Sequence, residues 1–357
     1  MMTEIEMQEM SSRMEQLFRK TNQIYAKLNS MTSIMSSEGK RRLEDRHVEK
    51  GYYRNFPVSE EEDPSFKEQF LALIKGLDKE SIRQVTQIIH RLQILKNSEG
   101  TLLPEFTDEE MKQLSFMEEH FEKEVLRLSK DCYFYNGYML PTPRFEACVF
   151  VDGCGVKDID RPERFQDKDI IDAGAYIGDS ALIFSGLTSK KVYAFEPTMK
   201  NYQDMLKTIE MNGLENVVPC RYALGSEKGT AEMTDAVVSA TNAYVEKSTM
   251  PYMSTETVDV VRLDDFVKEN DLHVGLIKTD VEGAEQMLLA GAMETIRTQR
   301  PTLLISIYHN ASDFYSIKPM LESLGLGYHF KIRHPVIGTI LMETMLIAEA
   351  DDGANYD

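Results

Sequence analysis

The architecture of this chain is set by residues 170–182, which read Ile-Ile-Asp-Ala-Gly-Ala-Tyr-Ile-Gly-Asp-Ser-Ala-Leu. An apolar run ends in an acid, a turn with two glycines follows, and a short helix is predicted to begin after the turn. A second apolar run, Val192–Phe195, ends in another acid, Glu196. A strand, a glycine-containing loop and a helix are typical of a cofactor site, and an acid after each of two successive strands indicates a nucleoside with free ribose hydroxyls.

The glycine spacing argues against a cofactor with a pyrophosphate. A dinucleotide fingerprint counted from Gly174 would need glycines at Tyr176 and Asp179, and Gly178-Asp179-Ser180 lacks the lysine of a Walker loop. An acid beside a helix N-terminus repels phosphate, whereas S-adenosylmethionine has no phosphate and carries two cationic groups that acids suit. We therefore predict S-adenosylmethionine, rather than the NAD of an oxidoreductase or an ordinary turn with helix-capping acids.

The composition limits which binding partners and which cellular compartment are expected for this chain. The chain has 357 residues, which is enough for two domains including a full α/β core, and a formal net charge of −19. Nucleic acid is an unfavourable partner for such a chain, because a phosphate backbone favours a basic face. The four cysteines have neither CxxC nor metal-ligand spacing, and the sequence has no apolar signal segment or membrane-spanning run. We expect a cytoplasmic protein with reduced thiols, no nucleic-acid partner and no membrane span.

The first third of the sequence is predicted to be mainly helical. Residues 1–35 carry methionine, leucine and other apolar residues at steps of three and four, which forms an a/d heptad seam. This seam indicates either a coiled coil that makes a homo-oligomer or a helix packed on its own chain. A polar linker is expected over 36–64 and a helical region over 65–131, where Thr107 and Glu110 match a capping box.

A β-rich connecting segment and an α/β domain are predicted to follow. The last N-terminal helix should run through Leu128, and aromatic and β-branched residues then favour strands within 132–168. Over 169–350 strands alternate with helices, which indicates a parallel sheet. Its strands are expected at 170–171, 192–195, 217–222, 274–279, 302–307, 328–332 and 339–348. Other expected segments are an irregular region at 226–257, a helix at 284–297 and an acidic tail at 351–357.

Polar residues follow several of these strands at their carboxyl ends. In an open α/β sheet, ligands bind beyond that edge. The groups expected there are Asp172, Glu196, Asp280, Glu282 and His309. We therefore expect a single site along this edge.

Several motifs, taken in their order along the chain, resemble those of FkbM-type S-adenosylmethionine-dependent methyltransferases. The motifs are Asp-Ala-Gly-Ala-Tyr-Ile-Gly-Asp at 172–179, Phe-Glu-Pro at 195–197, Ala-Leu-Gly at 223–225, Leu-Asp-Asp at 263–265, Ile-Lys-Thr-Asp-Val-Glu-Gly-Ala-Glu at 277–285, Ile-Tyr-His-Asn at 307–310 and Arg-His-Pro at 333–335. The resemblance covers residues 132–350. It implies a Rossmann-like class I methyltransferase sheet of seven strands with the last antiparallel. It also implies methylation of a hydroxyl, often on a sugar or natural product.

The resemblance further implies roles for individual residues. The turn after the first strand would hold the methionine end of the cofactor, Glu196 the ribose, and Tyr222–Leu224 the adenine, while Asp280 would face the methyl group and the acceptor. The expected cofactor-binding residues are Asp172, Gly174, Ala175, Tyr176, Gly178, Asp179, Ser180, Glu196, Pro197, Tyr222, Ala223, Leu224 and Asp280.

Methyl transfer to a hydroxyl requires alignment with the methyl group and removal of a proton. The candidate bases are Asp280, Glu282 and His309, of which His309 has a near-neutral reference pKa. The same three side chains are a possible set of ligands for Mg²⁺ or Mn²⁺, but their spacing in the sequence does not bring them together, so no metal is predicted. We predict an O-methyltransferase acting on a small-molecule or glycan hydroxyl. The alternative is a binding or scaffold module that keeps the fold without turnover.

Overall fold

The computed structural model describes residues 55–97, 106–234, 255–335 and 338–351. The predicted coiled-coil helix at 1–35 lies outside the described residues. The same holds for most of the linker at 36–64, for residues 235–254 of the predicted irregular region, and for the acidic tail after Asp351.

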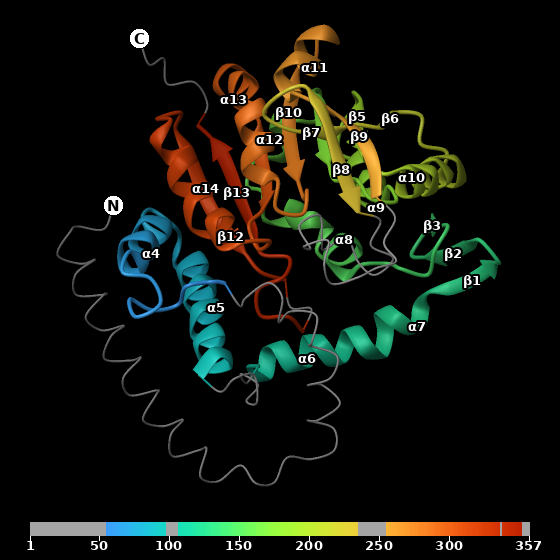
Figure 1. The fold of residues 1–357 in the computed structure, drawn as a ribbon. Helices are drawn as coiled ribbons and strands as arrows, with labels where there is room; N and C mark the ends of the chain where they lie inside the picture. The colour runs from blue at the N-terminus through green and yellow to red at the C-terminus, as the bar shows by residue number, and fades with distance from the viewer. Residues whose placement is uncertain (1–54, 98–105, 235–254, 336–337, 352–357) are drawn as a thin grey trace.

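A seven-stranded sheet forms the centre of the molecule (Figure 1). Its order is β6-β5-β4-β10-β11-β13-β12, and β13 runs antiparallel to both of its neighbours. The strands are β4 (Asp169–Ala173), β5 (Val192–Phe195), β6 (Val217–Cys220), β10 (Val274–Thr279), β11 (Thr302–Ser306), β12 (Tyr328–Arg333) and β13 (Met345–Ala350). This topology confirms the predicted fold class.

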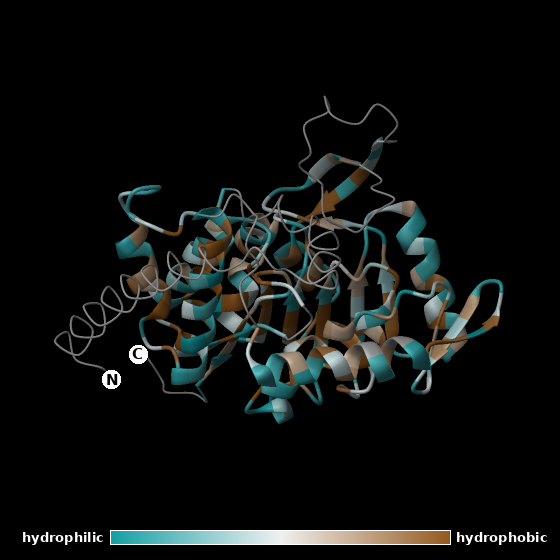
Figure 2. Ribbon diagram, turned by 90° about the horizontal axis from the view of Figure 1, so that it is seen from below, coloured by the Kyte–Doolittle hydropathy of each residue, from teal (hydrophilic) through white to brown (hydrophobic). Residues whose placement is uncertain are grey.

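The sheet is buried on both faces, as expected for a parallel sheet whose strands are continuous apolar runs. Successive residues point to opposite faces, so Ile170 and Ile171 belong to two separate hydrophobic cores. One face is covered by α9 (Asp179–Ser185) and α10 (Met199–Asn212). The other is covered by α11 (Leu263–Glu269), α12 (Glu285–Gly291), α13 (Met293–Gln299) and α14 (Ala311–Ser323). Figure 2 shows the apolar strands enclosed by helices whose outer faces are hydrophilic.

Two N-terminal helices extend the second of these cores. Helices α4 (Phe66–Ile74) and α5 (Lys79–Asn97) lie beside α14 and the edge strand β12. The hydroxyl of Ser81 on α5 accepts a hydrogen bond from the backbone N–H of Ile332 at 2.9 Å, so α5 covers the edge that β12 would otherwise leave open.

The described end of the predicted polar linker is solvated only in part. Phe56 and Val58 are buried, and the Phe56 ring meets the ring of Phe314 on α14 with centroids 5.7 Å apart. The hydroxyl of Tyr315 donates to the carbonyl of Pro57 at 2.8 Å. Two apolar residues therefore anchor the start of this polar stretch to the core, whereas Glu60, Glu61 and Glu62 are exposed as the linker prediction expects.

A long helical segment leads from this region to a small hairpin sheet (Figure 1). It comprises α6 (Asp108–Phe116), the π-helical turn η2 (Met117–Phe121) and α7 (Glu122–Glu124). The capping box of Thr107 and Glu110 is confirmed by both of its hydrogen bonds. The helix ends at Glu124 rather than Leu128, because Leu126–Ser129 forms β1 and pairs with β2 (Cys132–Tyr135).

Other boundaries also differ from the predictions. After β3 (Tyr138–Leu140), the supposed β-rich segment is made of the helical turns α8 (Ala147–Phe150), η3 (Gly153–Asp158) and η4 (Pro162–Arg164). The predicted helix at 284–297 divides at Ala292, because the buried carboxylate of Asp264 accepts hydrogen bonds from the N–H groups of Glu294 and Thr295 and so caps a second helix.

The strand expected from residue 339 starts only at Met345, after a turn in which Glu343 has a φ of +65°. Strand β6 ends at Cys220, short of the predicted residue 222. The chain then enters a separate small sheet of β7 (Ala223–Leu224), β8 (Gly229–Thr234) and β9 (Thr255–Val261). Within the described ranges, no helix combines the length and apolarity needed to cross a membrane.

Candidate active site

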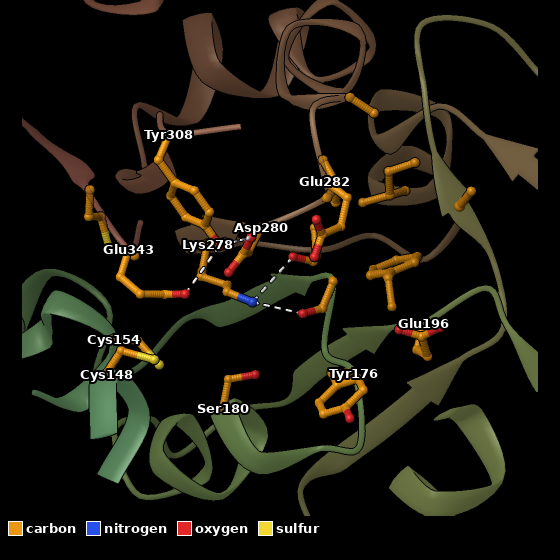
Figure 3. Close-up of a pocket in the computed structure, with 18 of the residues that line it drawn as sticks. Cys148, Cys154, Tyr176, Ser180, Glu196, Lys278, Asp280, Glu282, Tyr308 and Glu343 are labelled. Atoms are coloured by element: carbon orange, nitrogen blue, oxygen red, sulfur yellow. Dashed lines mark hydrogen bonds between the residues drawn. The ribbon is translucent and has the colours of Figure 1, made fainter. Parts of the chain in front are cut away.

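The carboxyl ends of the central strands open onto a cavity of about 970 Å³ (Figure 3). Its wall is made by the turn after β4, by Glu196 after β5, and by Asp280 and Glu282 after β10. Residues from α8 and the small sheet complete it. The structure thus gathers most of the predicted polar strand ends around one space.

The turn after β4 fits tightly against the end of β10. Gly174 has a φ of +76°, and a Cβ at this position would lie 1.7 Å from the carbonyl oxygen of Asp280. The backbone N–H of Asp280 donates to the carbonyl of Ala173 at 3.0 Å. Tyr176 has a left-handed backbone as well, with a φ of +48°, which is uncommon for a residue with a side chain and is typical of functional turns.

Most of the residues predicted to bind the cofactor line this cavity. They are Gly174, Tyr176, Asp179, Ser180, Glu196, Pro197, Tyr222, Ala223, Leu224 and Asp280. Asp172, Ala175 and Gly178 lie outside the lining, and the side chain of Asp172 is 0% exposed. The prediction that Asp172 touches the cofactor is therefore corrected, because its carboxylate is buried beneath the turn.

Asp172 is paired with a buried lysine that sequence reasoning did not single out. The Nζ of Lys278 lies 3.3 Å from Oδ1 of Asp172 and donates to the carbonyl oxygen of Gly174 at 2.8 Å. The hydroxyl of Ser180 donates to Oδ2 of Asp172 at 2.6 Å. Burial opposes the charge on Lys278, but Asp172 and Asp280 raise the pKa of the lysine above its ordinary value. The cation therefore links the turn after β4 to β10.

Glu196 is held by the start of the next helix. Its Oε1 accepts hydrogen bonds from the N–H of Thr198 at 2.9 Å and from the hydroxyl of Thr198 at 2.6 Å. Burial raises the pKa of Glu196 to about 7, against the hydrogen bonds from Thr198 that lower it. The carboxylate lies in the same cavity as Tyr222, Ala223 and Leu224.

The cavity is strongly acidic. Among its described lining residues, carboxylates outnumber lysine and arginine side chains. Burial and the neighbouring Glu146 raise the pKa of Asp179 to about 8, and burial with Asp280 raises the pKa of Glu343 to about 8. Burial and Asp280 also raise the pKa of Glu146. Carboxyl groups with raised pKa values lack sufficient counter-charge, so this cavity favours a cationic ligand over a phosphate.

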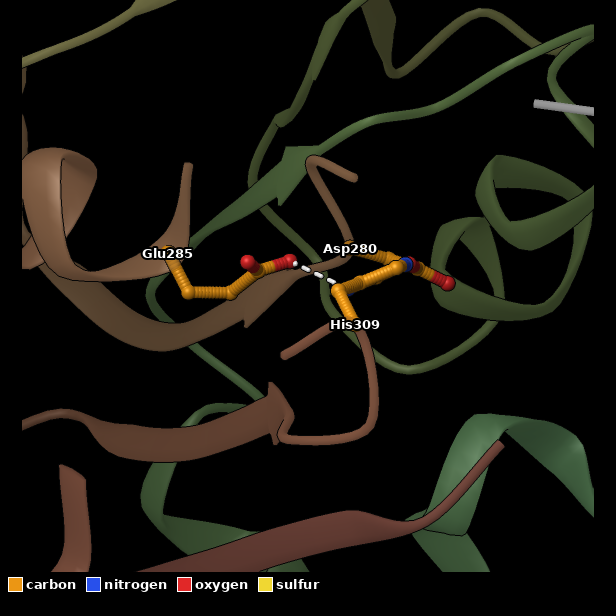
Figure 4. Close-up of side chains that lie close together, drawn as sticks. All are labelled: Asp280, Glu285 and His309. Carbon is orange, nitrogen blue, oxygen red and sulfur yellow. Dashed lines mark ion pairs between the residues drawn. The ribbon is translucent and has the colours of Figure 1, made fainter. Parts of the chain in front are cut away.

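Three acids surround His309 next to the cavity, and Figure 4 shows two of them, Asp280 and Glu285. Its Nδ1 lies 3.0 Å from Oε1 of Glu285, while its Nε2 lies 3.3 Å from Oδ1 of Asp280 and 3.4 Å from Oε2 of Glu282. Burial lowers the pKa of His309, but Glu285 and the other acids raise it to about 9.

The setting of His309 does not suit the predicted role of general base. A protonated imidazole has no lone pair to accept a proton. The His309 side chain is only 2% exposed and does not line the cavity, whereas Asp280 and Glu282 do. Glu282 has a φ of +57°, and burial raises its pKa to about 9.

Residues 172–330 match the Methyltransferase FkbM domain. This stretch of the chain is therefore similar to an FkbM-type methyltransferase domain. The chain is 27% identical over 229 residues to Methyltransferase 1 of Beauveria bassiana (strain ARSEF 2860), which covers 57% of this chain and 89% of that relative.

Solved structures of methyltransferases are also similar to this chain. The crystal structure of Methyltransferase FkbM from Methylobacillus flagellatus KT matches with 20% identity and a TM-score of 0.49, over 79% of this chain and 58% of that chain. This chain therefore spans little more than half the length of that protein. Aeropyrum pernix fibrillarin in complex with natively bound S-adenosyl-L-methionine matches with 14% identity and a TM-score of 0.34, over 56% of this chain and 73% of that chain.

The site also contains residues that the sequence did not reveal. The hydroxyl of Tyr308 lies 3.4 Å from Oδ1 of Asp280 and 3.2 Å from Oε1 of Glu343. Glu146 and Glu343 reach the cavity from a helical turn and from the loop before β13, and no periodicity marks either of them. Lys278 had a readable signal, because it is a lone charge in the apolar run of β10.

Proposed function

We propose that this chain transfers a methyl group from S-adenosylmethionine to a hydroxyl of a sugar, glycan or natural product. The observation that carries the proposal is the acidic cavity at the strand ends, where Asp179 and Glu343 have raised pKa values. A ligand with a sulfonium and an ammonium supplies the counter-charge that these carboxyl groups lack. The turn that begins at Gly174 has neither the lysine of a Walker loop nor the glycine spacing of a dinucleotide-binding loop, so it lacks the features that bind a pyrophosphate.

The residues present fit this methyl donor. Glu196 would accept hydrogen bonds from the ribose hydroxyls, and Tyr222 and Leu224, which line the same cavity, would lie beside the adenine. Asp179 and the turn at Gly174 would hold the methionine end, and Lys278 would keep that turn in position. When bound, S-adenosylmethionine supplies an electrophilic methyl group on its sulfonium.

The chain's remaining task is to orient the acceptor and take its proton. As the new C–O bond forms, the hydroxyl must lose a proton, and positioned carboxylates can accept it. Asp280, Glu282 and Glu343 present carboxyl groups to the same cavity. We assign the acceptor subsite to this side, because the adenine would occupy the part of the cavity lined by Tyr222–Leu224.

Calorimetry with S-adenosylhomocysteine tests the assignment of the donor. Glu196→Gln and Asp179→Asn should each weaken binding by about tenfold or more, since each removes a charge-assisted contact of about 1.5–3 kcal/mol. Glu109→Gln is the matched control, because Glu109 lies on α6 with its side chain 78% exposed. If both cavity variants bound the ligand as tightly as the control, the donor assignment would be wrong.

The acceptor class needs a separate measurement. Mass spectrometry of products from a panel of glycans and hydroxylated small molecules, incubated with isotopically labelled S-adenosylmethionine, should reveal a methyl ether. Transfer only to amines or carboxylates would contradict the O-methyl assignment while leaving the donor assignment intact.

A further inference from the structure

When all three are ionised, the carboxyl groups around His309 carry more negative charge than one imidazolium neutralises. Glu285, Asp280 and Glu282 all approach the ring, at 3.0, 3.3 and 3.4 Å. A protonated imidazole has two N–H donors and a single positive charge. One N–H on Nε2 cannot be directed at two carboxylates at once, and both distances on that side exceed the usual range for a hydrogen bond.

Glu282 supplies an independent sign that a ligand belongs here. Its Oε2 is buried and makes no hydrogen bond with any residue that the structure describes, and its ion-pair distance to Nε2 of His309 is a long 3.4 Å. Its backbone is left-handed, with a φ of +57°, in a residue type that rarely adopts this conformation. A buried carboxylate oxygen without a donor is costly unless a cation reaches it.

On the Nδ1 side of the His309 ring, a carboxylate holds the imidazole as it does in many metal sites. Oε1 of Glu285 faces Nδ1 of His309 and also accepts the backbone N–H of Val281 at 2.9 Å. A carboxylate on one imidazole nitrogen fixes the tautomer and orients the other nitrogen toward a metal. Donor atoms of Asp280, Glu285 and His309 lie within 4.8 Å of one another, and Oε2 of Glu282 approaches the same imidazole at 3.4 Å.

We propose that Asp280, Glu282 and Nε2 of His309 bind a divalent transition-metal ion of the Mn²⁺ class, which displaces the proton from Nε2, with Glu285 as the residue that positions the imidazole. A mixed set of nitrogen and oxygen donors favours such an ion over Ca²⁺ or Mg²⁺, which prefer oxygen alone. Asp280 and Glu282 line the cavity, so the open coordination positions face the space for the acceptor.

The role of this ion in catalysis rests on the function proposed above. A divalent ion lowers the pKa of a hydroxyl that it binds. The hydroxyl proton then passes to Glu343, which the Tyr308 hydroxyl connects to Asp280. The acceptor oxygen bonds to the methyl carbon, the C–S bond breaks, and its electron pair stays on sulfur to give the neutral thioether.

Titration of the tag-free, full-length chain with Mn²⁺, followed by electron paramagnetic resonance of the free ion, tests the site without any acceptor. The wild type should bind one Mn²⁺ per chain. Glu282→Gln should weaken binding at least tenfold, and Glu285→Gln by about 10–100-fold through the imidazole. His329→Ala is the matched control, because His329 also pairs with a carboxylate, Asp351, but lies exposed at the far end of β12.

Two further measurements keep the test decisive. Calorimetry with S-adenosylhomocysteine on the same samples reports whether each variant is folded. An anomalous difference map from crystals soaked in Mn²⁺ should show a peak between Asp280, Glu282 and His309. The absence of bound Mn²⁺ at millimolar concentration, or equal binding by wild type and Glu282→Gln, would overturn the metal site. If S-adenosylhomocysteine still bound in that case, the proposed function would stand.

Discussion

Replacing Lys278 by methionine should damage both the stability of the fold and the binding of the methyl donor. The lysine side chain is 6% exposed and the carboxylate of Asp172 is 0% exposed, with 3.3 Å between their charged atoms. Removing one partner of a buried ion pair costs about 3–5 kcal/mol, because the other charge is left uncompensated. With an unfolding entropy of about 2.1 cal/mol/K per residue, a 357-residue chain should lose about 4–7 °C in Tm.

The loss of S-adenosylhomocysteine binding should distinguish Lys278 from a buried lysine that only stabilises the fold. Lys278 holds the carbonyl of Gly174, so its loss should loosen the cofactor turn and weaken S-adenosylhomocysteine binding by about tenfold. Lys318→Met is the control, since Lys318 is equally buried and pairs with Glu322 at 2.9 Å, but on α14 and away from the cavity. Both variants should melt earlier in differential scanning calorimetry, and only Lys278→Met should lose affinity.

A double-mutant cycle measures the pair directly. Asp172→Asn combined with Lys278→Met leaves two neutral side chains, so the double variant should be more stable than the sum of the two single losses predicts, by at least about 1 kcal/mol. Strictly additive losses, or an unchanged affinity in Lys278→Met, would refute the account of the lysine as the link between the turn and β10.

Two other outcomes follow from the site. The affinity for S-adenosylhomocysteine should rise between pH 6 and pH 8.5, because Asp179 and Glu196, with pKa values of about 8 and about 7, attract the ligand only when ionised. Calorimetry of Asp179→Asn should show a flatter profile above pH 7, and an unchanged profile would contradict this reading. Gly174→Ala should abolish binding and lower Tm severely, since its Cβ would overlap the carbonyl of Asp280, whereas Gly137→Ala, with a φ of +92° but open space around it, should cost only about 1–2 kcal/mol. Equal melting temperatures for the two glycine variants would show that close packing at Gly174 is unimportant.

The sheet could be predicted from the sequence because its strands are read from local patterns. The limits expected for β5 and β10 match the structure, since each is an apolar run closed by a polar residue. The break at Ala292 could not be foreseen, because it depends on a capping carboxylate from Asp264, which lies 30 residues before its partner Glu294. Likewise, Phe56 has a polar neighbourhood in the sequence, and only tertiary contact with Phe314 reveals it as core.

The site was predictable in outline for a similar reason. Strand ends must gather at one edge of a parallel sheet, so Glu196 and Asp280 were expected to share a cavity, and they do. Whether a given side chain faces that cavity depends on its face of the strand and on its partner. Asp172 was therefore assigned to the cofactor although Lys278 holds it below the surface. Glu343 arrives from the loop before β13, about 170 positions from the turn it faces, and only the folded topology brings it there.

Because Phe56 and Val58 are anchored in the core, they limit where the chain can be truncated without exposing apolar surface. The part recognisable as an FkbM domain begins at residue 172, yet the apolar surface of α14 and β12 is closed by residues from 56 onward. A fragment cut at the boundary of the recognisable part would leave that surface bare and prone to aggregation. Limited proteolysis should accordingly yield a resistant core that retains residues 55–97. The part of the chain that is similar to the family is therefore smaller than the part that folds as one unit.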